Sequence, residues 1–432
     1  MALNLASLAS IAIEQISDTL PQLTETSDTL AAIFKDNGRA VAVGSPGPTA
    51  AGAFRVPMKY AEVGNAGIID LNGGTLPTGG QPAWNHGTLT PIAWAVAVQW
   101  TLLAQLAGES SKLVVQNAVD ETLASQTRMI KFWRDVAYHT DGTGTIGTVD
   151  AVDTVNNIVT MKSLPFGARF LREGQSVDLY NGTAKRSGSP YVIDRVYKRL
   201  GATQQFHYTG SDIGSAGQGD FIKFSGVTDG APVWVYGLPY FINVSTAGSL
   251  LGITKSTADY VVSNGYDMAG AQISLPVLQL VKAQVKNRVG PEALKNQFWY
   301  THQSQVAAYK ELGFSVQMIT SNGQFGDLDL LFKGKISIDG DPVVEGIHAD
   351  QQSWYYLNPE DWGRATYGKP PFFIENPQGG KIFTPYDSST GMPTTGMVSY
   401  LADAFQAYCM NVMTQAAITT CRVPAGHYDS AH

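Results

Sequence analysis

Residues 89–107 read LTPIAWAVAVQWTLLAQLA, and this uncharged stretch decides how the whole chain is interpreted. It is the second half of a longer segment, residues 71–108, that contains no Asp, Glu, Lys or Arg. Residues 92–98 alternate in the period-two pattern of a β-strand. A large uncharged apolar segment at the surface of a protein marks a contact site. The segment therefore predicts a strand that another protein molecule covers, most simply a second copy of the same chain.

The segment that precedes this strand is predicted to be a loop. It holds a series of chain breakers: Asn72-Gly73-Gly74, Pro77, Gly79-Gly80 and Pro82. Residues 54–60 read as an outgoing strand, and residues 92–100 read as the strand that returns. Residues 40–100 are therefore predicted to be a long β excursion with a tip rich in glycine and proline.

A membrane span is the alternative that the length of residues 89–107 permits. Pro91, Gln99 and Gln105 interrupt the apolar run, and basic flanking residues are missing. The N-terminal segment also carries no Lys or Arg before Lys35, so it lacks the basic region of a signal peptide. We expect no membrane association.

The composition also suggests extensive contact with neighbours. Charged residues make up 15% of the 432 residues, against about 25% in an ordinary soluble domain, while the hydrophobic content of 44% is ordinary. The formal net charge is −7 and no long run of Lys or Arg occurs, which argues against a nucleic-acid-reading domain. Low charge without raised hydrophobicity fits a protein whose surface is largely buried in an assembly.

The clearest helix is predicted from about Ser110 to His139. Apolar or neutral residues recur at steps of four and three on one face: Val115, Val119, Leu123, Gln126, Ile130, Trp133 and Ala137. Asp141-Gly142 is expected to end the helix. Residues 2–36 also look helical, in two pieces separated near Pro21.

Residues 143–230 contain an internal repeat of short β runs. Residues 149–152 recur as 193–196, and residues 173–179 recur as 218–224. Two copies of one β unit could pair and close a small barrel, which would remove exposed strand edges. The unit lies between a helix and the strand-like residues 233–238, so it is predicted to be a domain inserted into a host domain.

The remainder is a mixed α/β region. Ser274 is expected to cap a helix that runs to Val289, and a second helix is expected over residues 303–312, ended by Gly313. Strands are expected at residues 297–302, 335–338, 342–344 and 417–423.

Motifs for catalysis or cofactor binding are weak. The dinucleotide-like run at residues 142–147 follows a helix and precedes strands, the reverse of what phosphate binding requires, so it is interpreted as a linker. Asp339-Gly340-Asp341 reads as a turn. Cys409 and Cys421 read as buried hydrophobic residues, and the seven histidines lack metal-ligand spacing. We predict no catalytic residue, metal or cofactor, although spatial pairing of carboxylates is invisible in a sequence.

The order of these elements resembles the major capsid proteins of tailed bacteriophages, which have the Hong Kong 97-like fold. The resemblance rests on the N-terminal arm, the long β loop, the spine helix, the mixed domain, and the C-terminal run WYYLNPEDW at residues 354–362 followed by a Gly/Pro loop. It covers the chain except the β insertion, and it depends on element order because the family has no short diagnostic motif.

The resemblance implies an α+β subunit with six parts: an N-terminal arm (1–39), an extended β loop (40–100), the spine helix of a peripheral domain (101–142), an inserted β-barrel (143–230), an axial domain (231–350), and returning strands and loop (351–432). It further implies self-assembly into hexamers and pentamers of an icosahedral phage head. The head would be assembled in the host cytoplasm and would enclose double-stranded DNA without sequence-specific binding. Scaffolding, portal and decoration proteins are the further partners that it implies.

Contacts between subunits are expected from the extended loop, at Phe54, Arg55, Lys59, Leu76, Trp84 and His86. Some family members crosslink through a lysine in this loop, but no motif around Lys59 supports crosslinking here. Three alternatives stay open: a tail, baseplate or surface-layer protein, an encapsulin-like shell, and an exported polysaccharide-active enzyme with an accessory barrel. A paired-carboxylate cleft would favour the enzyme.

Overall fold

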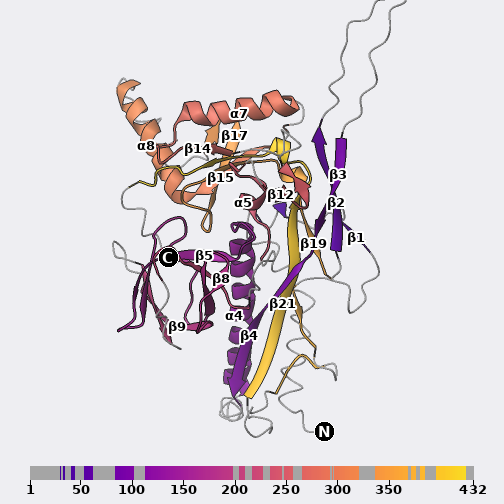
Figure 1. The fold of residues 1–432 in the computed structure, drawn as a ribbon, viewed down its shortest axis with the longest axis vertical. Coiled ribbons are helices and arrows are strands. Elements are labelled where there is room, and N and C mark those ends of the chain that lie inside the picture. Colours follow the sequence, from indigo (N-terminus) through magenta and orange to yellow (C-terminus); the bar gives the residue numbers. More distant parts are fainter. Residues whose placement is uncertain are drawn as a thin grey trace, which may run out of the picture.

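The structure is a computed structural model, and it describes most of the chain outside the N-terminal segment. The described residues are 30, 33–34, 40–43, 53–61, 83–101, 112–197, 204–209, 217–226, 234–245, 248–255, 265–291, 294, 296–320, 336–367, 371–375, 380–384 and 396–424. Within these ranges, no helix has the length and apolar character needed to cross a bilayer. The architecture is sheet-rich and mixed, with one long central helix (Figure 1).

The central helix, α4 (Lys112–Tyr138), runs beside a sheet made of β4 (Ile92–Thr101) and β21 (Gly396–Cys409) (Figure 1). These two strands pair antiparallel over ten residues, from Ile92 opposite Phe405 to Thr101 opposite Gly396. On its other side β21 pairs with β19 (Trp362–Thr366) and β20 (Phe372–Phe373).

The predicted spine helix is confirmed within two residues at either end. Four members of its predicted inner face are buried: Gln126, Ile130, Trp133 and Ala137. The side chains of the other three, Val115, Val119 and Leu123, lie outside the described residues. Gly142 follows the helix with φ of +86°, and a Cβ at this position would lie 2.6 Å from the Tyr236 ring. Glycine therefore permits the sharp exit from the helix.

The β excursion differs from the expectation in its returning strand. β2 (Ala53–Ala61) pairs with β1 (Val41–Val43) and with β3 (Ala83–Leu89), which the sequence analysis placed in the loop. The prediction that residues 92–100 return along β2 is therefore wrong: after Thr90-Pro91 the chain enters β4, which belongs to the β21 sheet. Proline lacks the amide donor that a continuous ladder needs, so Pro91 separates the two strands.

Residues 145–224 form a sheet that closes on itself, here called the closed sheet. Its strands follow the order β11-β5-β6-β10-β9-β7-β8, and β11 also pairs with β7. The strands are β5 (Thr145–Asp153), β6 (Ile158–Met161), β7 (Ser176–Asn181), β8 (Ala184–Lys185), β9 (Tyr191–Tyr197), β10 (Gln205–Thr209) and β11 (Phe221–Phe224).

The predicted repeat corresponds to two strand triplets, β5-β6-β7 and β9-β10-β11. β6 pairs with its counterpart β10, and β7 pairs with its counterpart β11. The two copies therefore satisfy each other's edges, as the repeat predicted. The core inside includes Val149, Val177, Ile193 and Ile222.

The closed sheet shares its core with α4. Trp133 and Val136 of the helix are buried in the same cluster as the barrel-facing residues. The Trp133 ring meets Phe224 edge to face at 4.6 Å between centroids, and Phe224 stacks on Trp234 at 4.2 Å. The helix thus joins the closed sheet to the rest of the described structure.

The remaining large sheet has the order β14-β22-β18-β15-β17-β16. Its strands are β14 (Gly265–Asp267), β15 (Phe298–His302), β16 (Ser337–Ile338), β17 (Asp341–Gly346), β18 (Trp354–Leu357) and β22 (Ala416–Thr419). A small hairpin, β12 (Ser249–Leu250) with β13 (Ile253–Thr254), lies near β3. The short helices are α5 (Leu238–Phe241), η4 (Pro359–Asp361) and η5 (Val412–Thr414).

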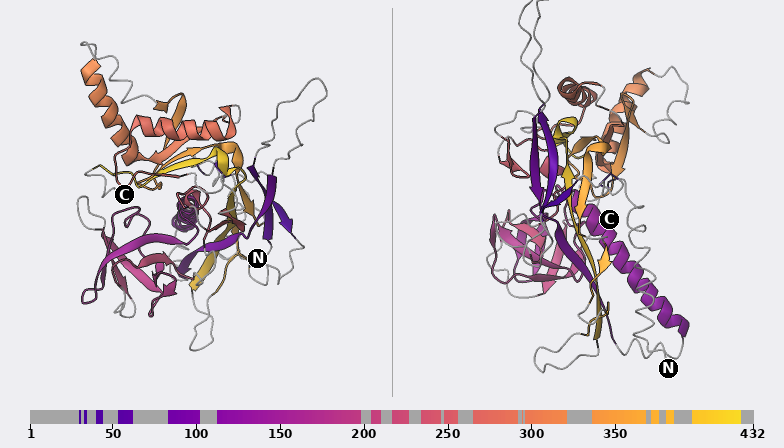
Figure 2. Two further views of the ribbon diagram at one scale, coloured as in Figure 1. Left: turned by 45° about the horizontal axis from the view of Figure 1, so that its top comes forward. Right: turned by 90° about the vertical axis from the view of Figure 1, so that its right-hand side faces the viewer.

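Two longer helices accompany this six-stranded sheet, α7 (Leu275–Val289) and α8 (Gln303–Thr320) (Figure 2). α7 confirms the predicted start after Ser274 and end before Gly290. α8 continues past Gly313, so the predicted stop there is wrong. An interior glycine costs a helix only about 1 kcal/mol, which neighbouring helical residues can offset.

Candidate assembly surface

The two faces of β4 have opposite environments. Along one face Ala93, Ala95, Ala97 and Gln99 are exposed, while the alternate residues from Ile92 to Val98 are partly buried. On the inner face Trp94 lies 5.9 Å from Trp234 between ring centroids. The period-two pattern of the sequence thus separates a packed face from an uncharged face open to solvent.

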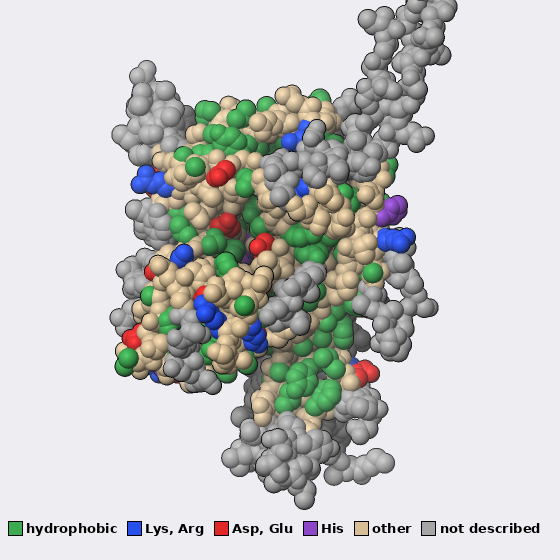
Figure 3. All heavy atoms as spheres, in the orientation of Figure 1, with side chains coloured by type: hydrophobic (Ala, Val, Ile, Leu, Met, Phe, Trp, Pro, Cys, Tyr) green, Lys and Arg blue, Asp and Glu red, His purple; other side chains and the backbone are tan. Residues whose placement is uncertain are grey.

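β21 lies beside β4 in this sheet. Ala402 and Ala404 lie opposite Ala95 and Ala93 in the ladder, but both are buried, so the exposed alanines belong to β4. Figure 3 shows a green, uncharged area over the lower part of β4 and β21. The pairing of β4 with β21 was not predicted from the sequence.

The outer edge of β4 has no strand partner among the described residues. β21 occupies one edge over the whole length of β4, and no second pairing of β4 occurs in the described part of the chain. Natural sheets usually protect such an edge with charge, proline or short length. β4 is ten residues long and carries no charged residue. This edge, here called the open edge, is therefore suited to accept a strand from another molecule.

Internal contacts hold this surface in a fixed position. Gln126 of α4 donates from Nε2 to the Val96 carbonyl at 2.7 Å. Arg134 donates from Nε to Asp403 at 2.8 Å, and both side chains are at most 2% exposed. Burial raises the pKa of Tyr138 next to this pair, although the nearby Arg364 and Arg134 act to lower it. The spine helix and β21 are thus joined by a buried ion pair.

The predicted contact residues of the extended loop fall into three groups. Trp84 is 55% exposed, and Arg55 and His86 are exposed beside it on the β2–β3 hairpin. Phe54 instead packs inside its own subunit, with its ring 5.7 Å from that of Tyr367. Lys59 lies in β2 but its side chain is outside the described residues, as is the whole of Leu76.

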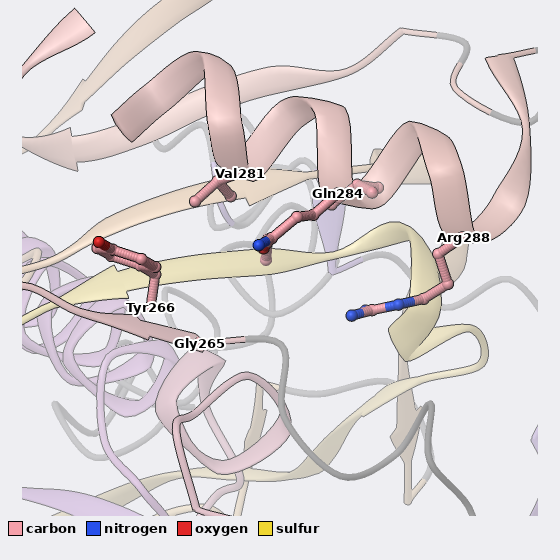
Figure 4. A pocket seen from close by; sticks show the side chains of 7 residues that line it. Gly265, Tyr266, Val281, Gln284 and Arg288 are labelled. Atoms are coloured by element: carbon pink, nitrogen blue, oxygen red, sulfur yellow. The ribbon is translucent and has the colours of Figure 1, made fainter. Parts of the chain in front are cut away.

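The described residues offer little evidence of a metal site or a small-molecule pocket. No group of three or more His, Cys, Asp or Glu side chains lies together as a metal site within the described ranges. A hollow between α7 and β14, lined by Tyr266, Gln284 and Arg288, has room for about one water (Figure 4). Cys409 and Cys421 are buried and unpaired with each other, as predicted, and burial raises the pKa of both thiols.

Comparison with known proteins places these features in context. No protein-family profile and no curated protein sequence matches the chain. Among solved structures, the chain is similar to the cyanophage A-1(L) capsid asymmetric unit, with a TM-score of 0.49 and 12% identity over 93% of this chain and 92% of that one. It is also similar to the capsid of an empty GTA particle (TM-score 0.43, 10% identity, 92% and 90% covered) and to a Mycobacterium phage Bobi structure (0.43, 8%, 91% and 91%).

The chain is similar to phage capsid proteins. The resemblance inferred from the order of elements in the sequence agrees with these comparisons.

Proposed function

We propose that the protein is the major structural subunit of a phage-type capsid, with a Hong Kong 97-like fold. In this proposal subunits assemble into the hexamers and pentamers of an icosahedral head that encloses double-stranded DNA. Scaffolding, portal and decoration proteins would be its further partners. The function is structural, with no catalytic step.

The observation that carries the proposal is the uncharged strand β4. Its exposed face carries alanine and glutamine, and its open edge has no partner among the described residues. A free monomer with this strand in water would be prone to pair edge to edge. In a shell the neighbouring subunit covers the strand, so the same feature becomes a specific contact.

The parts of the subunit then take the following roles. α4 is the spine helix of the peripheral domain, and the six-stranded sheet with α7 and α8 is the axial domain. The β2–β3 hairpin is the base of the extended loop, and Trp84, Arg55 and His86 are its candidate contacts with a neighbour. The closed sheet is a β-barrel inserted at about residues 143–230.

A charge placed on β4 tests the proposal. Ala95→Lys should lower the yield of closed particles by at least about a hundredfold, because a buried unpaired charge costs several kcal/mol and each 1.4 kcal/mol is tenfold. The free energy of unfolding of the subunit should change by less than about 0.5 kcal/mol, since Ala95 is exposed in the monomer. Sedimentation velocity and negative-stain electron microscopy measure the yield.

Ala151→Lys is the matched control, because Ala151 is an exposed strand alanine on the closed sheet. It should leave assembly unchanged. Normal particles from Ala95→Lys would refute the role of β4. Tubes or flat arrays from the wild type would instead favour the tail or surface-layer alternative.

A further inference from the structure

Ionisable side chains gather where three parts of the subunit meet. These parts are the last turns of α4, residues 164–172 of the closed sheet, and residues 346–351, which follow β17 of the six-stranded sheet. The group, here called the junction, consists of Asp135 from α4, His139 directly after α4, Arg169 from the closed sheet, Tyr300 from β15, and His348 and Asp350 from the loop.

The first connection at the junction runs from α4 to the six-stranded sheet. The Asp135 carboxylate is hydrogen-bonded to Nδ1 of His348 and lies 3.7 Å from Nε2 of His139. The His139 ring stacks on Tyr300 with centroids 5.6 Å apart and planes 7° apart, and its Nε2 lies 3.2 Å from the Tyr300 hydroxyl. His139 is 2% exposed, so this contact is sealed from solvent.

The second connection runs from the closed sheet to the same loop. Arg169 donates to the carbonyl of Ala349 at 2.6 Å and to that of Ile347 at 3.4 Å. Its guanidinium also lies over the rings of Phe166 and Phe170, at 5.3 and 5.0 Å from their centroids. Residues 347–350 are therefore held from one side by the helix and from the other by the closed sheet.

A proton on His139 would add one positive charge to the junction. The junction also holds the carboxyl groups of Asp135 and Asp350 and the guanidinium of Arg169. Charges interact strongly in a site shielded from water. Burial and the nearby Arg169 disfavour a proton on His139, whereas Asp135, whose carboxylate lies 3.7 Å from Nε2, favours it. Asp350 is a second carboxyl group that interacts with His139.

We propose that the junction is an acid-released latch. Near neutral pH it holds the closed sheet and residues 346–351 against α4, and acidification releases them, so that the closed sheet and the six-stranded sheet can shift relative to the spine helix. The latch is a property of the single subunit and does not depend on the proposed function.

The direction of the effect follows from linkage. Burial lowers the pKa of His139 from its ordinary 6.5, with Asp135 acting in the opposite direction. The stability that neutral His139 contributes is therefore present above pH 6.5 and is lost as pH falls toward the lowered value. Asp350 works against this at lower pH, because burial raises its pKa and the closed junction then takes up a proton there. The weakening is largest between pH 6.5 and the point at which Asp350 protonates.

Hydrogen exchange measured by mass spectrometry on the full-length protein tests the latch. Exchange rates at neutral pH and at about pH 5 are corrected for the intrinsic pH dependence of amide exchange. Local opening of residues 164–172 and 346–351 should increase by up to about tenfold per pH unit, the change expected for one proton taken up on opening. The helix α7, which contributes no residue to the junction, should keep its protection.

The variant His139→Gln should abolish most of this acid response, whereas His86→Gln, a change at an exposed histidine of β3, should leave it intact. An unchanged acid response in His139→Gln would overturn the proposal. If that variant does not fold, the wild-type measurement decides alone: equal protection of both segments at the two pH values would also overturn it.

Discussion

The β4–β21 sheet and the closed sheet differ in whether their strand edges are paired within the chain. In the closed sheet, pairing of β11 with β7 leaves no long edge, and ion pairs such as Lys185–Asp178 and Arg186–Asp220 lie at this seam. In the other sheet, β4 keeps an open edge and carries no charge along ten residues. The closed sheet pairs its strand edges within the chain. The open edge of β4 has no strand partner among the described residues, and we propose that another molecule covers it.

The largest effect on stability should follow from loss of the buried Arg134–Asp403 ion pair, which joins α4 to β21. Asp403→Ala leaves Arg134 without this carboxylate and should lower the free energy of unfolding by about 3–5 kcal/mol. Because the pair joins α4 to β21, particle yield should fall as well. Chemical denaturation and electron microscopy check the two effects. A variant with wild-type stability would show that the pair is not what fixes the sheet on the helix.

A smaller change in the closed sheet should separate stability from assembly. Ile193 is fully buried in the core of that sheet, and Ile193→Val should cost about 0.5–1.5 kcal/mol. Particles should still form, since the β4 surface is unaffected. Differential scanning calorimetry together with sedimentation tests this. Loss of particles at such a modest cost would mean that the closed sheet takes part in assembly.

The smallest effect is expected at the seam of the closed sheet. Lys185 donates to Asp178 at 2.9 Å, but its side chain is 33% exposed and solvent screens the pair. Asp178 also accepts from the Gly226 amide. Lys185→Met should therefore cost less than about 1 kcal/mol, and the loss should shrink at high salt. Thermal melts at two ionic strengths measure this loss of stability. A loss of several kcal/mol would indicate that the ion pair, and not strand pairing, closes the sheet.

The sequence predicted those elements whose periodicity was strong and local. The helix α4 with the described half of its inner face, the strand at residues 92–100 and the repeat within residues 143–230 were correct, because each pattern extends over several residues. The pairing partner of β4 was wrong, since β21 lies some 300 residues further along the chain and no local pattern encodes that contact. β3 was missed because Asn85, His86 and Gly87 read as loop residues, although they pair with β2.

For the candidate surface, the sequence indicated the segment but not its geometry. The absence of charge over residues 71–108 predicted a region covered by another molecule, and β4 is the part of it that has the open edge. The predicted contact at Phe54 is packed within its own subunit, which a sequence cannot distinguish from a contact with a neighbour. The junction around His139 was not foreseen, because its members come from positions 135 to 350 and meet only in the folded chain.

The uncharged surface of β4 also has a consequence for rates of association. Electrostatic steering, which raises association rate constants above about 10⁵–10⁶ M⁻¹s⁻¹, requires complementary charges on the approaching surfaces. β4 offers none, so contact along this strand gains no steering from charges of its own. The net charge of −7 is the same on every copy, so two copies repel each other at long range, and added salt should speed their encounter by screening that repulsion.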